Sequence, residues 1–307
     1  MNDFIIEVNN LTKRFGHFIA VDKVGFNVRK GEIFGFLGAN GAGKSTTIRM
    51  LCGLLKPTSG LALVAGFDID KSPEKVKASI GYMSQKFSLY DDLTIEENLT
   101  FFGGIYGLDN HRLKTRISWA LEMADLKNNK NRATHELSGG WKQRLALGCA
   151  LLHEPKIVFL DEPTGGVDPI SRRNFWELIN ILSEQGITIF VTTHYLDEAE
   201  YCNHILLIQA GKIIAGGSPN EMKKKYLTNP IIEVECSDPL KALEVLQKNN
   251  QILEISIFGL HLHINVLNEK EGIKIIEKTL ESNGISILNV NKIVPSLEDV
   301  FIHLIEK

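Results

Sequence analysis

The sequence predicts an α/β domain with a mixed sheet and an inserted helical subdomain, followed by a small α+β domain of the ferredoxin-like type. Two short, solidly apolar runs at 157–160 and 187–192 are typical of central strands that are covered on both faces. A glycine-rich loop lies between a strand and a helix, and the C-terminal part has the order βαββαβ. We expect the first domain at residues 1–218, its helical subdomain at about 86–155, and the second domain at 219–307.

The predicted elements follow from apolar spacing and from turn residues. In the first domain we expect strands at 4–9, 19–28, 33–37, 61–65, 157–160 and 187–192, with a candidate edge strand at 79–83. We expect helices at 45–55, between 94 and 126, from the motif LSGGWKQR (137–144) to just before His153, and at 169–183. In the second domain we expect strands at 231–236, 252–258, 260–266 and 285–293 and helices at 240–248, 271–282 and 297–305.

Composition indicates a soluble globular chain with a sizeable core. Of its 307 residues, 44% are apolar and 23% are charged, and the formal charge of −3 gives no general attraction to nucleic acid or to anionic membranes. The four cysteines form no CxxC pair and are typical of reduced core residues in a cytosolic protein. We find no signal-peptide pattern and no apolar run of the roughly 18 residues that a membrane span needs. If the protein works at a membrane, a partner must supply the spans.

The sequence GANGAGKST matches the phosphate-binding pattern GxxxxGK[ST] between a predicted strand and a predicted helix. Glycines let backbone N–H groups curl around phosphate oxygens, and the helix N-terminus adds a partial positive charge. The lysine of this pattern reaches the β- and γ-phosphates, and the hydroxyl after it can bind Mg²⁺. The predicted nucleotide-binding residues of the loop are Gly38, Ala39, Asn40, Gly41, Ala42, Gly43, Lys44, Ser45 and Thr46.

Two adjacent carboxylates stand at the end of a predicted buried strand in IVFLDE (157–162). Neighbouring side chains on a strand point to opposite sides, so the two groups can serve different roles. Asp161 fits the acid that is linked to Mg²⁺ in P-loop NTPases, and Glu162 is then free to orient or deprotonate the attacking water. The alternative is a pair of helix-capping acids on a loop.

Three single residues carry little information by themselves. Gln85 follows the candidate edge strand, His194 follows the apolar strand ITIFVTT, and Phe15 lies in LTKRFG. Considered alone, such a glutamine is usually solvent-facing, such a histidine usually packs, and such a phenylalanine usually belongs to the core.

The order of the phosphate loop, Gln85, LSGG, IVFLDE, Asp168 and His194 resembles the ATP-binding-cassette (ABC) ATPase family over roughly residues 1–220. LSGG is the family's own signature, so the resemblance is specific. It implies a P-loop NTPase cassette that uses ATP and Mg²⁺ and works as a head-to-tail dimer with a second ATP-binding subunit. Each ATP is then sandwiched between the two copies.

The resemblance also implies roles for individual positions. Phe15 corresponds to the aromatic residue that stacks on adenine, and Asp168 corresponds to the acid that communicates across the dimer. The signature residues that bind the γ-phosphate of the partner's ATP correspond to Ser138, Gly139 and Gly140. The implied catalytic residues are the carboxylate Glu162, the switch histidine His194 and the hinge residue Gln85. The implied metal site comprises Ser45, Gln85 and Asp161.

Two departures from the family pattern concern the signature and the dimer loop. The signature's fifth residue is usually Gln and here is Trp141, and the dimer loop reads GGVD (165–168), which keeps the acid. With Ser138 at the N-cap, two glycines begin the helix at a cost of up to about 1 kcal/mol each, which makes sense where a phosphate approaches so closely that a Cβ would intrude. We expect Trp141, which can only donate a hydrogen bond, to pack within the helical subdomain or, alternatively, at the dimer or permease interface.

The C-terminal extension, which ends SLEDVFIHL, resembles the ATPases of type-two exporters of drugs, lipids or polysaccharides. This implies a separate integral-membrane permease, contacted near Gln85 and residues 91–98, and a cytoplasmic location on the inner face of the membrane. Two alternatives remain: an ATPase of a soluble assembly such as iron–sulfur cluster delivery, and a regulatory module that binds nucleotide without hydrolysis. The extension itself is a packing or dimer-supporting domain, or a ligand sensor.

Overall fold

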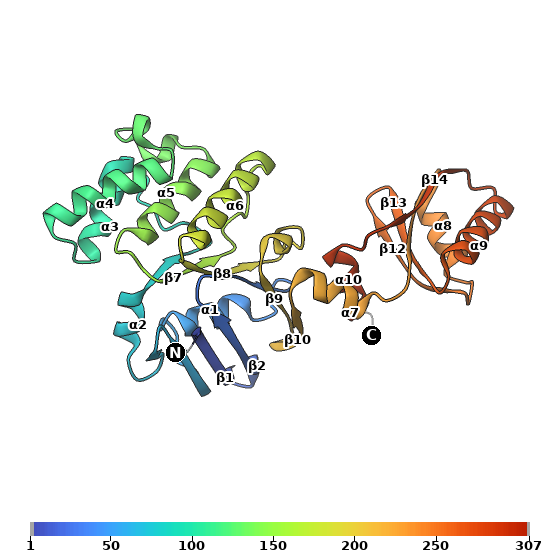
Figure 1. Cartoon of the computed structure of the whole chain (residues 1–307), viewed down its shortest axis with the longest axis horizontal. Coiled ribbons are helices and arrows are strands. Elements are labelled where there is room, and N and C mark those ends of the chain that lie inside the picture. Colours follow the sequence, from blue (N-terminus) through green and yellow to red (C-terminus); the bar gives the residue numbers. More distant parts are fainter. Residues whose placement is uncertain (1–2, 306–307) are drawn as a thin grey trace. The chain divides into compact units, whose positions relative to one another are not determined.

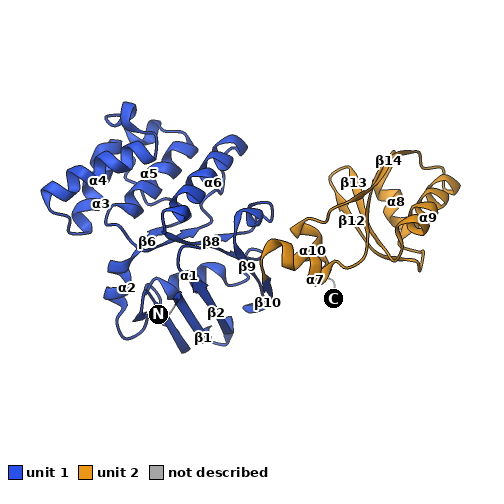
Figure 2. Ribbon diagram, viewed as in Figure 1, with its two compact units in different colours: residues 1–216 blue, residues 217–307 orange. Residues whose placement is uncertain are grey.

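The computed structural model describes residues 3–305, and the chain divides into two compact units, residues 1–216 and 217–307 (Figure 2). An antiparallel sheet of unit 1 comprises β1 (Phe4–Phe15), β2 (Phe18–Arg29), β4 (Ser59–Val64) and β5 (Phe67–Asp68). A second sheet comprises β3 (Ile33–Leu37), β6 (Ile80–Met83), β7 (Ile157–Asp161), β8 (Thr188–Thr193), β9 (His204–Gln209) and β10 (Lys212–Gly217). The strand orders are β2-β1-β4-β5 and β10-β9-β3-β8-β7-β6.

The central strands of the second sheet run parallel, and polar residues follow their carboxyl ends. Strand β3 pairs in parallel with β8 and β9, and β7 pairs in parallel with β8 and β6. All residues of β3, β7 and β8 are buried, as the solidly apolar runs predicted. The segments that follow β3, β6, β7 and β8 therefore meet at one edge of the sheet.

Aromatic side chains join the two sheets. Phe26 of β2 stacks on Phe34 of β3 with the ring centroids 5.5 Å apart, and Phe34 stacks on Phe190 of β8 at 5.3 Å. Phe34 and Phe190 are fully buried. Burial of such a ring stabilises a fold by up to about 3 kcal/mol, so this cluster fixes the two strands whose ends carry the phosphate loop and His194.

The helices of unit 1 flank the sheets and form the inserted subdomain (Figure 1). They are α1 (Lys44–Leu51), α2 (Pro73–Ser79), α3 (Ile95–Ile105), α4 (Asn110–Met123), α5 (Gly139–Leu151) and α6 (Pro169–Glu184), with short 3-10 helices η1 (Lys127–Asn129), η2 (Thr134–Glu136) and η3 (Glu198–Tyr201). The subdomain helices α3, α4 and α5 share a core that includes Leu99, Leu121 and Leu145. Helix α3 begins with a capping box in which Thr94 and Glu97 bond reciprocally.

Unit 2 has the predicted ferredoxin-like order. It comprises α7 (Pro219–Tyr226), β11 (Ile231–Cys236), α8 (Pro239–Leu246), β12 (Ile252–Phe258), β13 (His261–Val266), α9 (Glu269–Ser282), β14 (Ile287–Ile293) and α10 (Leu297–Ile305). The sheet order is β12-β13-β11-β14, and its three strand pairs are antiparallel. The fold class predicted for both parts of the chain is confirmed.

Several element boundaries differ from the sequence predictions. Helix α1 ends at Leu51 and not at Leu55, because Gly53 adopts a left-handed φ of 67°. The predictions did not include β5, β9, β10, α2 or α7. Strands β9 and β10 join through Ala210 and Gly211, which both have positive φ. Within residues 3–305, no helix has both the length and the apolar character needed to cross a bilayer.

Candidate nucleotide-binding site

The glycine-rich loop joins β3 to α1 along a backbone path that needs glycine. Gly41 and Gly43 have left-handed φ values of 81° and 110°. A Cβ on Gly43 would lie 2.5 Å from the carbonyl oxygen of Ala20 in β2, and a Cβ on Gly38 would lie 2.3 Å from that of Ile208 in β9. Two strands therefore press on the loop and hold its backbone close to the N-terminus of α1, where N–H groups can receive an anion.

Lys44 is the first residue of α1 and is buried beneath this loop. Its ammonium donates to the carbonyl oxygens of Gly38 at 2.7 Å and Ala39 at 3.2 Å. The same Nζ lies 3.2 Å from Oε1 of Glu162. The lysine thus connects the loop to the residue that follows β7, and its charge lies at the floor of the site.

Three side chains from different segments of the chain lie against the carboxylate of Glu162. Besides the contact of its Oε1 with Lys44, its Oε2 accepts a hydrogen bond from Gln85 Nε2 at 3.1 Å and lies 3.3 Å from His194 Nδ1. Gln85, Glu162 and His194 come after β6, β7 and β8, which are neighbours in the sheet. The parallel topology therefore brings together three predicted residues that are far apart in the sequence.

The backbone of Glu162 is held in an unusual conformation. Its φ is 48°, in the left-handed region that non-glycine residues rarely occupy. Its N–H donates to the carbonyl oxygen of Thr192 at 3.0 Å and to that residue's hydroxyl at 3.1 Å. Such strain persists only where the surroundings fix it. Here the two hydrogen bonds to Thr192 of β8 hold the backbone of Glu162 in this conformation.

Asp161 makes contacts separate from those of Glu162. Its Oδ1 accepts from Thr192 Oγ1 at 2.7 Å and from Ser45 Oγ at 3.2 Å. Burial raises the pKa of Asp161, the two hydroxyls oppose this, and the charge of Glu162 adds to it. A hydroxyl and a carboxylate beside a phosphate loop are the hard oxygen ligands that suit Mg²⁺, so the donor set fits this ion.

A cleft of about 470 Å³ lies over these groups and is walled on one side by two phenylalanines. Phe15 is 49% exposed and Phe18 is 64% exposed. They face each other across the turn between β1 and β2, since Phe15 and Phe18 are register partners. The sequence analysis missed Phe18; the signal was its position across a two-residue Gly-His turn from Phe15.

The signature residues lie away from this cleft, at the start of α5. Ser138 is the N-cap, as predicted, and Gly139 and Gly140 are the first two helical residues. A Cβ on Gly140 would lie 2.5 Å from Ser171 Oγ and 2.6 Å from Ser171 Cβ in α6, whereas the space around Gly139 is open to 3.9 Å. Gly140 therefore has a packing reason within its own chain, namely the close approach of α6, whereas a Cβ on Gly139 would make only ordinary van der Waals contacts. The phosphate contact expected at both glycines stays a prediction.

Asp168 is the N-cap of α6 in the same chain. Its Oδ1 accepts a hydrogen bond from the backbone N–H of Ser171 at 2.9 Å. This hydrogen bond holds the pKa of the exposed carboxyl below its usual range. The aspartate therefore has a clear local role within one chain, beside the intersubunit role implied by the family resemblance.

Trp141 packs within the helical subdomain. It is half-buried against the core of α3, α4 and α5, and the Arg132 guanidinium lies 6.0 Å from its ring centroid. The packing expected for this side chain therefore occurs inside one chain.

Two further buried side chains hold the loop after Glu162, and the sequence analysis identified neither. Gln143 of α5 donates through Nε2 to the carbonyl oxygen of Pro163 at 2.8 Å. Thr164 donates through its hydroxyl to Glu198 of η3. Nothing in the local sequence marks Gln143 or Glu198, because these contacts arise only when α5, η3 and the loop pack together.

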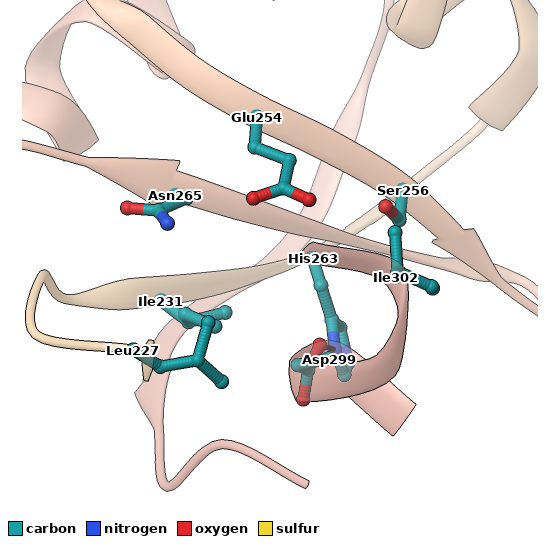
Figure 3. Close-up of a pocket in the computed structure, with 8 residues that line it drawn as sticks. All are labelled: Leu227, Ile231, Glu254, Ser256, His263, Asn265, Asp299 and Ile302. Carbon is teal, nitrogen blue, oxygen red and sulfur yellow. Dashed lines mark hydrogen bonds and ion pairs between the residues drawn. The ribbon is translucent and has the colours of Figure 1, made fainter. Parts of the chain in front are cut away.

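Unit 2 has a small cavity of its own, of about 20 Å³, beside α10 (Figure 3). Its walls include Glu254 and Asn265 on neighbouring strands, and Glu254 Oε1 and Asn265 Oδ1 have no hydrogen-bond partner within residues 3–305. The volume suits a single water molecule. Nearby, His303 Nδ1 of α10 lies 2.8 Å from Glu254 Oε2.

An acid–histidine pair also connects α10 to β13. His263 Nδ1 lies 2.7 Å from Asp299 Oδ1, and His263 Nε2 lies 3.3 Å from Glu233 Oε2. Burial alone would lower the pKa of His263, but Asp299 and Glu233 outweigh it and raise that pKa. Burial would raise the pKa of Asp299, but hydrogen bonds from His263 and Ser296 lower it. Both shifts favour the charged pair.

Three features together define an ATP-binding-cassette ATPase. They are the phosphate loop, the two carboxylates at the carboxyl end of β7, and helix α5 of the helical subdomain, which begins with Ser-Gly-Gly. Comparison with known proteins agrees. The model of the family described as "ABC transporter" matches residues 21–165, and that of the "ATP-binding protein DrrA1-3-like, C-terminal domain" matches residues 217–305. The chain belongs to the family of ABC transporter ATP-binding proteins.

Relatives support this assignment, two of them over nearly their full length. The linearmycin resistance ATP-binding protein LnrL of Bacillus subtilis (strain 168) is 34% identical over 304 residues, 98% of each chain. Nod factor export ATP-binding protein I of Rhizobium sp. (strain N33) is 34% identical, over 99% of this chain and 98% of that protein. The probable multidrug ABC transporter ATP-binding protein YbhF of Escherichia coli (strain K12) is 57% identical over 219 residues, 71% of this chain but only 38% of its own length.

Solved cassettes share the fold. The structure of cbiO1 from Clostridium perfringens, described as part of the ABC transporter complex cbiONQ, has a TM-score of 0.67 and 29% identity, and covers 81% of this chain and 100% of that chain. A dimeric post-hydrolysis state of the ATP-binding cassette MJ0796, bound to ADP and Pi, has a TM-score of 0.63 and 28% identity, and covers 69% of this chain and 98% of that chain.

Proposed function

We propose that this chain hydrolyses ATP as the nucleotide-binding subunit of an exporter and drives transport through a separate integral-membrane permease. The observation that carries the proposal is the convergence of Lys44, Gln85 and His194 on the carboxylate of Glu162, beside the phosphate loop. The export assignment rests on relatives that are named for drug resistance or for export and on the DrrA-like unit 2. The subunit then works on the inner face of the membrane, where the permease holds it.

In this proposal the residues around the cleft divide the work of hydrolysis. Residues 38–46 hold the phosphates, and Phe15, together with Phe18, stacks on the adenine. Ser45, Asp161 and Gln85 hold Mg²⁺, which neutralises phosphate charge when it is bound. Water attacks the γ-phosphorus while its proton passes to Glu162, and the bond to the β–γ bridging oxygen breaks to release ADP and phosphate. His194 contacts the γ-phosphate.

The proposal also includes a head-to-tail homodimer. Ser138, Gly139 and Gly140 lie outside the cleft of their own chain, so in this dimer they bind the γ-phosphate of the ATP held by the second copy. Asp168 then lies at the dimer interface as well as at its own helix cap. ATP binding closes the dimer, and hydrolysis reopens it.

Glu162→Gln tests the hydrolytic role with little change in shape. We expect phosphate release to fall by about 10²–10⁴-fold, because general-base catalysis typically contributes that much, while titration with a fluorescent ATP analogue still shows binding. The variant should also accumulate as an ATP-dependent dimer in analytical ultracentrifugation. Equal turnover in the variant and the wild type would remove Glu162 from the mechanism and favour a regulatory, non-hydrolysing module.

Affinity purification from detergent-solubilised membranes tests the export role. We expect an integral-membrane protein to co-purify with the full chain in stoichiometric amount. Co-purification of soluble assembly proteins, with no membrane protein, would contradict the exporter assignment and leave the ATPase assignment intact.

A further inference from the structure

Glu198 is a buried acid that the proposed chemistry does not use. It lies in η3 and is 1% exposed. A carboxylate is rarely buried to this extent unless several partners satisfy it. Its partners come from two different loops, and those loops carry two of the residues that meet in the nucleotide site.

Each oxygen of Glu198 is bound to one of these loops. Oε1 accepts from the hydroxyl of Thr164, which is two residues beyond Glu162. Oε2 accepts from the hydroxyl of Thr193 at 2.7 Å, and Thr193 directly precedes His194. One rigid carboxylate therefore joins the Glu162 loop to the His194 turn.

The Thr193 hydroxyl also fixes the shape of the histidine turn. It accepts from the N–H of Tyr195 at 3.0 Å while it donates to Glu198. The backbone on either side of His194 is thereby tied to a single side-chain oxygen. Because a hydroxyl has one donor and two acceptor sites, Thr193 can accept from the Tyr195 N–H and donate to Glu198 at the same time.

Arg172 of α6 completes the surroundings of the buried carboxylate. Its Nε lies 3.5 Å from Glu198 Oε1, and its guanidinium lies 4.1 Å from the ring centroid of Tyr195. Burial raises the pKa of Glu198, and the two hydroxyls and the Arg172 charge oppose this rise. The arginine thus supports the same acid and packs on the same turn.

We propose that Glu198 is a positioning residue for ATP hydrolysis. It holds the Glu162 loop and the His194 turn at the relative position in which the side chains of Glu162 and His194 are in contact. Glu198 is not among the residues that line the cleft. This inference rests on the proposed roles of Glu162 and His194. It predicts a loss in kcat with little change in KM, because the side-chain bonds of Glu198 go to Thr164 and Thr193 and not to the phosphate loop itself.

The test uses Thr193→Val and Thr164→Val, which remove one hydroxyl each and keep side-chain shape, together with Glu198→Gln. Thr188→Val is the matched control: Thr188 is equally buried at the other end of β8, and its hydroxyl accepts from the N–H of Gly31 at 2.9 Å. We expect kcat to fall about tenfold or more in the three test variants, since a misplacement of about 1 Å can cost about 10²-fold. KM should stay within about twofold, and Thr188→Val should keep the wild-type kcat.

A double-mutant cycle with His194→Ala separates positioning from general destabilisation. Single-turnover hydrolysis of labelled ATP should show that Thr193→Val costs less than about twofold once His194 is absent, because residues that act through one another are non-additive. Full additivity, or an equal loss in Thr188→Val, would overturn the proposal. If Glu198→Gln fails to fold, the threonine variants decide. Loss of turnover in Glu162→Gln with wild-type kcat in the threonine variants would reject only the role of Glu198, whereas retained turnover in Glu162→Gln would reject the proposed function.

Discussion

Replacing Gly140 with alanine should destabilise unit 1, whereas the same change at Gly139 should not. A Cβ on Gly140 would lie 2.5 Å from Ser171 Oγ and 2.6 Å from Ser171 Cβ, while the nearest atom to a Cβ on Gly139 lies 3.9 Å away. Overpacking of this kind costs about 1–3 kcal/mol, and alanine returns up to about 1 kcal/mol of helix propensity. After the full propensity gain, the expected net loss in the free energy of unfolding for Gly140→Ala is therefore up to about 2 kcal/mol.

Thermal unfolding of the full chain, followed by circular dichroism, measures this difference. A loss of up to about 2 kcal/mol should lower the Tm of a unit of this size by up to about 8 °C, and Gly139→Ala should keep or raise the Tm. Equal Tm values for the two variants would refute the steric reasoning, because Ser171 would then move aside at no cost. ATP turnover separates the remaining role: Gly139→Ala should lower turnover at unchanged Tm, because its Cβ would occupy the space that we assign to a partner's phosphate.

Two further predictions concern Trp141 and unit 2. Trp141→Gln should keep ATP turnover within about tenfold, because Ser138 and the two glycines are the groups assigned to phosphate, but should lower the Tm through lost packing. A collapse to the level of Glu162→Gln would place the tryptophan in the chemistry. Calorimetric unfolding across pH should show unit 2 losing stability as pH rises through the raised pKa of His263 and as pH falls through the lowered pKa of Asp299. His263→Gln should remove the alkaline loss, and a persistent loss in that variant would assign it to another group.

The parallel strands and the residues that follow them could be predicted from the sequence because both signals are local. Fully buried strands read as unbroken apolar runs, and a polar residue directly after such a run lies at the carboxyl edge of the sheet. For Glu162 the strand end itself indicated a role, whereas Gln85 and His194 carried little information alone and took their roles from the family resemblance. The family resemblance supplied their order, and the sheet order β8-β7-β6 explains their contact.

The supporting contacts could not be predicted, because each depends on how separate elements pack. Thr192 and Glu198 look like ordinary strand and turn residues, yet their side chains bind Asp161 and Thr164, which lie more than 30 residues away in the chain. Gly140 is the clearest example. The motif indicated a ligand beside it, and only the position of α6 shows that Ser171 leaves no room for a Cβ at this residue.

Ser171 connects the starts of helices α5 and α6. Its side chain lies so close to the first turn of α5 that it leaves no room for a Cβ on Gly140. Its backbone N–H donates to Asp168 Oδ1 at the start of α6. Gln143, one turn further along α5, grips Pro163 directly after Glu162. These contacts connect the signature helix, the dimer-loop acid and the segment after Glu162 within one chain. In a head-to-tail dimer, this connection would couple the ATP site of one chain to the ATP site of the other. The two sites would then hydrolyse ATP together rather than independently.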